Sequence, residues 1–134
     1  MTLRRKSREF ALQMLFEWDM ARQEPARVEK TFWKSARAAA STREFANELF
    51  EGTVQQASAL DELIAKVAEN WRLERLAAID RNILRLAIYE MRAGETPATV
   101  VIDEALELAK KFSSAEAPAF LNGVLDAARK SLAS

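Results

Sequence analysis

The stretch AAIDRNILRLAIYEMRAG, residues 77–94, decides the fold class of this chain. Its apolar side chains recur every three or four residues, which is the spacing of one face of an α-helix. They cover well over half of the helix circumference, so this helix is predicted to lie at the centre of the fold with neighbours on several sides. Gly94 follows where a left-handed C-terminal cap is expected. The apolar positions are Ile79, Ile83, Leu84, Leu86, Ala87, Ile88 and Met91.

The remaining sequence shows the same helical spacing and contains only three glycines and three prolines. It predicts an all-α protein of about seven helices. Thr96 is predicted to cap the helix after Gly94, with Pro97 at its first position. Gly123 lies within a helical pattern and is predicted to mark the close approach of another helix. Other helices are expected at 6–23, 26–39, from Ser41 or Thr42 onward, and at 60–70, with a connector at 71–76.

The chain is long enough for one domain or for two small helical units that share a core. No internal repeat or low-complexity linker is visible. The predicted division is an N-terminal bundle at 1–58 and a C-terminal bundle at 59–134, packed together.

Composition excludes several classes of function. The chain has no cysteine and no histidine, which removes disulfides, thiol nucleophiles, imidazole acid–base chemistry and most zinc sites. No apolar run reaches the roughly 18 residues of a membrane span. Acidic and amide residues interrupt the apolar run that a signal peptide would need. The sequence therefore predicts a soluble cytoplasmic protein without a cofactor.

Charge is balanced overall but not along the chain. Lys plus Arg and Asp plus Glu both number 20, yet residues 1–8 hold Arg4, Arg5, Lys6 and Arg8 with no acid. Such a segment often only increases solubility. Cations are slightly unfavourable at a helix N-terminus, however, so this cluster indicates an anionic partner. Single-stranded RNA is favoured over duplex DNA because no helix-turn-helix pattern is present.

Two aromatic residues are candidates for base stacking. Leu12 and Phe16 lie four residues apart, outside the main apolar stripe of the first helix. They fit burial against the second bundle, and Phe16 also fits a partly exposed ring beside the arginines. Phe120 has the same two interpretations, core residue or accessible ring.

A second polar surface follows the central helix. Arg81, Arg85, Tyr89 and Arg92 recur at helical spacing with Asp80 beside them, which fits a solvated face or a protein interface. The carboxylates Asp103, Glu104 and Glu107 are expected on a solvated face, with Glu107 paired to Lys111. No catalytic or metal site follows from them.

Three segments resemble the NusB family of transcription antitermination factors: RRKSREFALQMLFEWDM, IDRNILRLAIYEM and TPATVVIDEALELAKKFSSAEAPAFLNGVLDAARK. The resemblance implies two small helical bundles, no catalytic activity and a role in transcription. Family members bind boxA RNA in the leader of ribosomal RNA transcripts with the ribosomal protein NusE, and they help RNA polymerase to read through terminators. Relatives occur as monomers and as homodimers, and the sequence is compatible with both.

The resemblance also implies roles for individual residues. RNA contacts fall on Arg4, Arg5, Lys6, Arg8, Phe16, Glu116, Phe120 and Asn122, and the NusE-facing surface includes Asp80, Arg81, Arg85 and Tyr89. Phe16 replaces what is often tyrosine, so stacking is retained while a hydroxyl contact is lost. Ser113 and Ser114 stand where a glycine is common.

Two other functions remain alternatives. One is the NusB-like module of an RNA cytosine methyltransferase, which needs a Rossmann-type domain with a cysteine that these residues lack. The other is a protein-only module whose basic end meets an acidic partner. The RNA-binding hypothesis expects the opening arginines to stand in solvent. It predicts that Arg5→Ala or Arg8→Ala weakens RNA binding while the melting temperature changes by only a few degrees.

Overall fold

The computed structural model describes residues 3–68 and 72–133, which form helices and no strand. The predicted all-α fold is confirmed. The described residues contain α1 (Leu3–Ala21), α2 (Pro25–Ser35), α3 (Ala40–Gln55), α4 (Ala57–Val67), the 3-10 turn η1 (Leu73–Arg75), α5 (Ala78–Ala93), α6 (Ala98–Phe112) and α7 (Ala117–Ala133). Within this part of the chain, no helix has the length and apolar character needed to cross a membrane.

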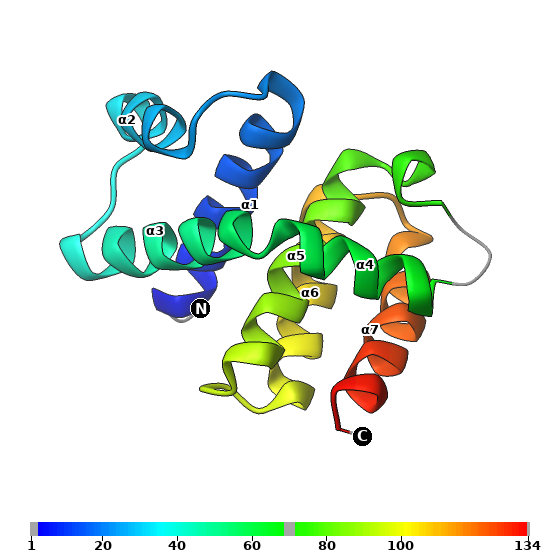
Figure 1. The fold of residues 1–134 in the computed structure, drawn as a ribbon. Helices are drawn as coiled ribbons and strands as arrows, with labels where there is room; N and C mark the ends of the chain where they lie inside the picture. Colours follow the sequence, from blue (N-terminus) through cyan, green and yellow to red (C-terminus); the bar gives the residue numbers. More distant parts are fainter. Residues whose placement is uncertain (1–2, 69–71, 134) are drawn as a thin grey trace.

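Helix α5 lies at the centre of the molecule, as its sequence predicts (Figure 1). It packs against α1 and α3 on one side and against α4, α6 and α7 on the other. Its apolar side chains are almost completely buried between Ile83 and Ile88. Gly94 ends the helix in the left-handed conformation with φ of 74°, which confirms the predicted cap.

The helices form two small bundles, α1–α3 and α4–α7, that share one continuous apolar core. In Figure 1, α3 and α4 follow one another with only Gln56 between them, so the bundles are joined without a linker. A boundary between residues 58 and 59 stays a prediction. In the first bundle, the ring of Phe10 packs edge-on against Phe32 and Trp33, which fixes α2 onto α1.

Several predicted helix ends are wrong by a few residues. Helix α1 begins three residues before Lys6 and ends where Arg22 adopts a positive φ of 57°. Helix α3 begins at Ala40, so neither predicted capping residue is its N-cap. Pro97, rather than Thr96, is the N-cap of α6. Trp71, part of the predicted connector, lies outside the described residues.

The close helix approach occurs at Gly52 and not at Gly123. A β-carbon at Gly123 would meet nothing within 4 Å, so the prediction for this residue is wrong. A β-carbon at Gly52, in contrast, would overlap the phenol ring of Tyr89. Helix α3 can therefore lie against α5 only because residue 52 has no side chain.

Alanine at these two glycines is expected to change stability in opposite directions. Gly52→Ala should lower the free energy of unfolding by about 1–3 kcal/mol, because the tyrosine must move. Gly123→Ala should raise it by about 0.5–1 kcal/mol, because alanine favours an exposed helix. Chemical denaturation measures both, and adding Tyr89→Leu to Gly52→Ala should restore part of the loss. Stabilisation by Gly52→Ala alone would contradict the close approach.

Candidate nucleic-acid interface

The first turn of α1 presents two exposed cations. The guanidinium of Arg4 lies over the ring of Phe45 on α3, 4.2 Å from its centroid. Lys6 is also exposed. These two side chains meet the expectation that the opening cations stand in solvent.

Arg5 is half-buried and forms a bidentate ion pair with Glu104 on α6. Its Nε donates to Oε1 at 3.0 Å and its Nη2 donates to Oε2 at 2.8 Å. The hydrogen bond from Arg5 lowers the pKa of Glu104, so this carboxylate stays ionised. The expectation that Glu104 lies on a solvated face is wrong, because it is paired across two helices.

Arg8 contradicts the expectation of a solvent-exposed arginine. It is 5% exposed, and its Nε and Nη2 donate to Glu90 on α5 at 2.6 and 2.9 Å. Burial alone would lower the pKa of Arg8, but the hydrogen bonds and charges of Glu90 and Glu104 outweigh it and raise the pKa. A buried arginine with a bidentate partner belongs to the core, so the guanidinium of Arg8 offers no surface for an RNA phosphate.

The two candidate stacking rings are both half-buried. Phe16 lies on α1 next to Leu15, which is completely buried. Phe120 lines a surface cavity of about 230 Å³ together with Leu76, Asp80 and Glu116. The ring of Phe120 packs against the core, and both rings keep part of their surface exposed. Leu12, by contrast, is completely buried and offers no surface to RNA or to a second copy of the chain.

Polar contacts bring the ends of several helices together near these rings. The Oγ of Ser113, at the end of α6, donates to Asp80 at the start of α5 at 2.6 Å. Arg81 bonds Asp19, which lies one turn after Phe16. Phe16 and the cavity of Phe120 therefore lie at the same end of the molecule. The opening cations lie at the other end of α1, where Figure 1 marks the N-terminus. Arg5 and Phe16 are eleven positions apart on this helix, which is about 16 Å along its axis.

The polar surface expected on α5 is largely internal. Arg85 is buried and donates to Asp61 on α4 at 2.7 and 2.9 Å, and it also contacts Asp19 on α1 at 3.2 Å. Arg81 donates to the same Asp19 at 2.7 and 2.9 Å. Burial alone would raise the pKa of Asp19, but hydrogen bonds from Arg81 and Asn82 outweigh it and lower the pKa. The prediction of an outward ridge is therefore wrong for both arginines, which join α1, α4 and α5.

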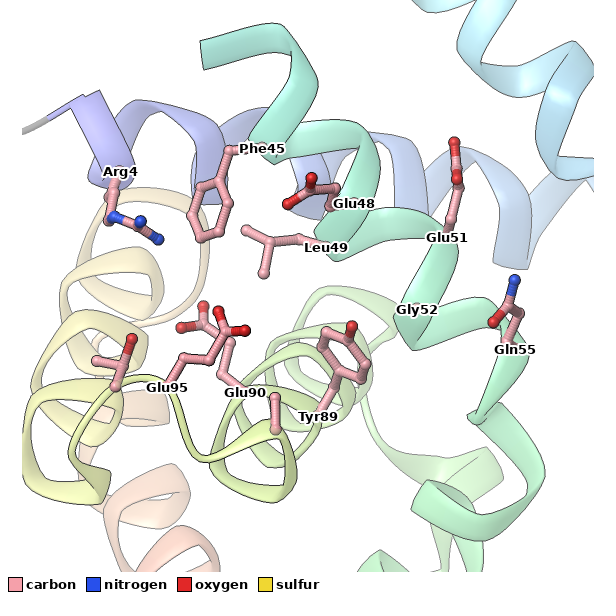
Figure 2. A pocket seen from close by; sticks show the side chains of 12 residues that line it. Arg4, Phe45, Glu48, Leu49, Glu51, Gly52, Gln55, Tyr89, Glu90 and Glu95 are labelled. Carbon is pink, nitrogen blue, oxygen red and sulfur yellow. The ribbon is translucent and has the colours of Figure 1, made fainter. Parts of the chain in front are cut away.

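Asp80 and Tyr89 lie on opposite sides of α5, so the four residues predicted to meet a protein partner do not share one surface. Tyr89 is half-buried beside a cavity of about 330 Å³ between α3 and the α5–α6 turn. Figure 2 shows this cavity, with Glu48 and Glu95 on either side of it and Arg4 at its edge. The charged residues that line the cavity are four glutamates and one cation, Arg4.

The model of the NusB family matches residues 5–130. The chain belongs to the NusB family. It is 51% identical over 131 residues to a transcription antitermination protein NusB of Koribacter versatilis, covering 96% of this chain and 90% of that protein. The NusB of Solibacter usitatus is 46% identical, with 98% and 92% covered.

Solved NusB structures share the fold. NusB of T. maritima superposes with a TM-score of 0.86 at 33% identity, covering 96% of this chain and 92% of that one. A structure of the antitermination factors NusB and NusE in complex with dsRNA gives a TM-score of 0.86 at 28% identity, with 98% of each chain covered.

In this NusB-family chain, sequence reasoning missed the carboxylates that hold the opening cations. Glu90 offered a signal, because it continues the apolar stripe of α5 four residues after Leu86, and a carboxylate at such a position needs a cationic partner. Glu9 offered the same signal on α1. The predicted pair of Glu107 with Lys111 is wrong, because Lys111 bonds Glu9 and Glu107 pairs with Lys110.

Among residues 3–68 and 72–133, no group of three or more acidic side chains could hold a metal ion. The remaining predicted RNA contacts, Glu116 and Asn122, are exposed near the start of α7.

Proposed function

We propose that this chain is a non-enzymatic, cytoplasmic RNA-binding antitermination factor that recognises boxA-type single-stranded leader RNA of ribosomal RNA operons together with NusE. The observation that supports it most is the arrangement on α1. The exposed cations Arg4 and Lys6 lie at the start of this helix, and the half-exposed ring of Phe16 lies further along the same rigid helix. Phosphates contact cations and bases stack on rings, so one helix offers both kinds of contact.

The proposed roles differ among the predicted RNA-binding residues. Arg4, Arg5 and Lys6 contact phosphates, while Arg8 acts from inside by holding the Glu104 carboxylate that also holds Arg5. The rings at the other end of α1 stack on bases, and polar side chains beside them contact base edges. The rings are Phe16 and Phe120, and the polar side chains are Glu116 and Asn122.

A protein partner is proposed to bind α5 at its exposed edges. Asp80 and Tyr89 reach cavities at opposite ends of the helix, and Arg81 and Arg85 hold the helix in place from within. The glutamates around the cavity beside Tyr89 suit a basic surface on the partner, and we propose that this partner is NusE. This assembly would then join RNA polymerase in an antitermination complex.

RNA affinity is expected to fall when both exposed cations of α1 are neutralised. Arg4→Gln with Lys6→Gln should weaken binding of boxA-type RNA by roughly tenfold or more at about 0.1 M salt, because two phosphate contacts are lost. The melting temperature should change by no more than a few degrees, since both side chains are exposed. Fluorescence anisotropy at two salt concentrations, with and without NusE, measures the affinity.

The matched control is Arg129→Gln with Lys130→Gln on α7, which removes the same charge from surface ion pairs with Asp126. It should leave RNA affinity within about twofold. Scrambled and double-stranded RNA of equal length test the preference for a single strand of boxA type. Light scattering determines whether the RNA-bound chain is a monomer or a homodimer. Equal losses in the two double variants would contradict the α1 surface. A chain that binds NusE but binds no RNA, with NusE present or absent, would favour a protein-only module.

A further inference from the structure

One buried carboxylate on α1 holds two lysines at the surface. Glu9 has a side chain that is only 5% exposed, and its Oε1 contacts the Nζ of Lys111 on α6 at 2.9 Å and the Nζ of Lys6 at 3.7 Å. The lysine side chains are 50% and 45% exposed. Two positive charges thus share one negative charge, and the positive charges face the solvent.

Lys111 lies between the phosphate contacts proposed for the start of α1 and the base contact proposed for Phe16. Arg5, Glu9, Leu12 and Phe16 follow one another at spacings of four, three and four, so they form one stripe along α1. Two residues of this stripe contact α6: Arg5 bonds Glu104, and Glu9 bonds Lys111 further along α6. Helices α1 and α6 therefore run in the same direction here. A single strand of RNA that extends from the basic segment to Phe16 therefore passes Lys111.

We propose that Lys111, held by Glu9 beside Lys6 of the basic segment, forms a phosphate-binding site for the RNA backbone on the side of this segment that faces Phe16. This inference rests on the proposed RNA-binding function and adds a residue from α6 to it. An ammonium has three N–H donors, so a lysine whose side chain is half exposed and bonds one carboxylate can bond a phosphate oxygen as well. The Glu9 carboxylate fixes the position of Lys111 before RNA arrives, which lowers the conformational entropy that binding would lose.

Neighbouring Lys110 provides the contrast. It lies about 100° further around α6. Its Nζ contacts Glu107 at 3.0 Å, and both of these side chains are largely exposed. The two lysines are adjacent in sequence and equal in charge. Comparing RNA binding by variants of each therefore distinguishes a positioned phosphate site from general electrostatic attraction.

Lys111→Gln is expected to weaken binding of boxA-type single-stranded RNA about fivefold at about 0.1 M salt, because one phosphate contact with a single strand is lost. The slope of log affinity against log salt should become shallower by about 0.7. Binding of a scrambled RNA should weaken by the same factor, because a phosphate contact carries no sequence information. Lys110→Gln, the matched control, should stay within about twofold of the wild type.

Glu9→Gln tests positioning directly. If net charge alone governed binding, removing this carboxylate would raise RNA affinity; the proposed site predicts that affinity falls, because Lys111 loses its fixed position. Thermal unfolding of each variant shows whether it is folded at the assay temperature. If Glu9→Gln is unfolded, the RNA affinities of Lys111→Gln and Lys110→Gln decide whether the phosphate site exists.

Equal weakening by Lys111→Gln and Lys110→Gln, or no weakening by either, would overturn this site while the proposed function stands. Failure of the wild type to bind RNA, with and without NusE, would overturn both. Loss of NusE binding by Lys111→Gln in the absence of RNA would assign this lysine to the protein partner, which also overturns the phosphate site.

Discussion

Arg8→Ala is expected to lower the free energy of unfolding by about 3–5 kcal/mol, the usual cost of removing one member of a buried ion pair. The variant leaves the carboxylate of Glu90 buried with no guanidinium, and it also removes the contact of Arg8 with Glu104. The melting temperature should fall by roughly 10 °C or more. Thermal and denaturant unfolding followed by circular dichroism measure both quantities.

Arg5→Ala is the matched control for this prediction. Arg5 pairs with Glu104 at the surface, where its side chain is 33% exposed, so its removal should lower the free energy of unfolding far less than Arg8→Ala does. The double variant Arg8→Met with Glu90→Leu removes both buried charges and should recover most of the lost stability. If Arg8→Ala and Arg5→Ala had equally small effects, the buried pair would not be the stabilising contact described here.

This contrast corrects the expectation drawn from sequence. Both arginines were expected to affect RNA affinity alone, with little change in melting temperature. For Arg5, a small change in melting temperature stays the prediction. For Arg8, a large decrease is now expected, because only Arg8 lies inside the core. A loss of RNA binding by Arg8→Ala would therefore reflect a loosened scaffold and a less ordered Arg5.

Arg85→Ala is expected to destabilise the chain by a similar amount, about 3–5 kcal/mol. Arg85 is 6% exposed and joins Asp61 on α4 to Asp19 on α1, so its loss leaves Asp61 without its cation and leaves Asp19 with Arg81 alone. The two bundles meet at these contacts, and we expect the unfolding transition to broaden as well. Calorimetry measures the enthalpy and width of the transition.

The effect of Arg85→Ala should depend on pH. The pKa of Asp19 in the folded chain lies below the ordinary value of 3.8, so the stability from its ion pairs is present above that pH. It is lost as the pH falls through the pKa of the folded state. The difference between wild type and Arg85→Ala should thus shrink in acid. Arg92→Ala, an exposed arginine on the same helix, should have little effect at any pH.

The helical fold was predictable because it depends on spacing that can be read locally. The apolar positions from Ile79 to Met91 indicate a helix with several neighbours, and α5 has them on two sides. The ends of helices were less predictable. Several of them are decided by single backbone conformations, such as the positive φ of Arg22, to which composition gives little guide.

The candidate site was predictable only in part. The exposed positions of Arg4 and Lys6 follow from a basic segment at a helix start, and the half-burial of Phe16 follows from its place beside the apolar stripe. The functions of these side chains stay predictions. The burial of Arg8 and Arg85 was missed, because an arginine at helical spacing has the same sequence pattern on a surface and in a buried ion pair.

The sequence by itself determined the helices, the central place of α5 and the concentration of positive charge at the N-terminus, since each depends on residues that are neighbours in the chain. Only the tertiary structure decided which cations remain available to a partner. Arg8 meets Glu90 across 82 residues, and Lys111 meets Glu9 across 102. Pairing over such separations depends on how the helices pack, and packing selects which charges are buried together and which are held at the surface.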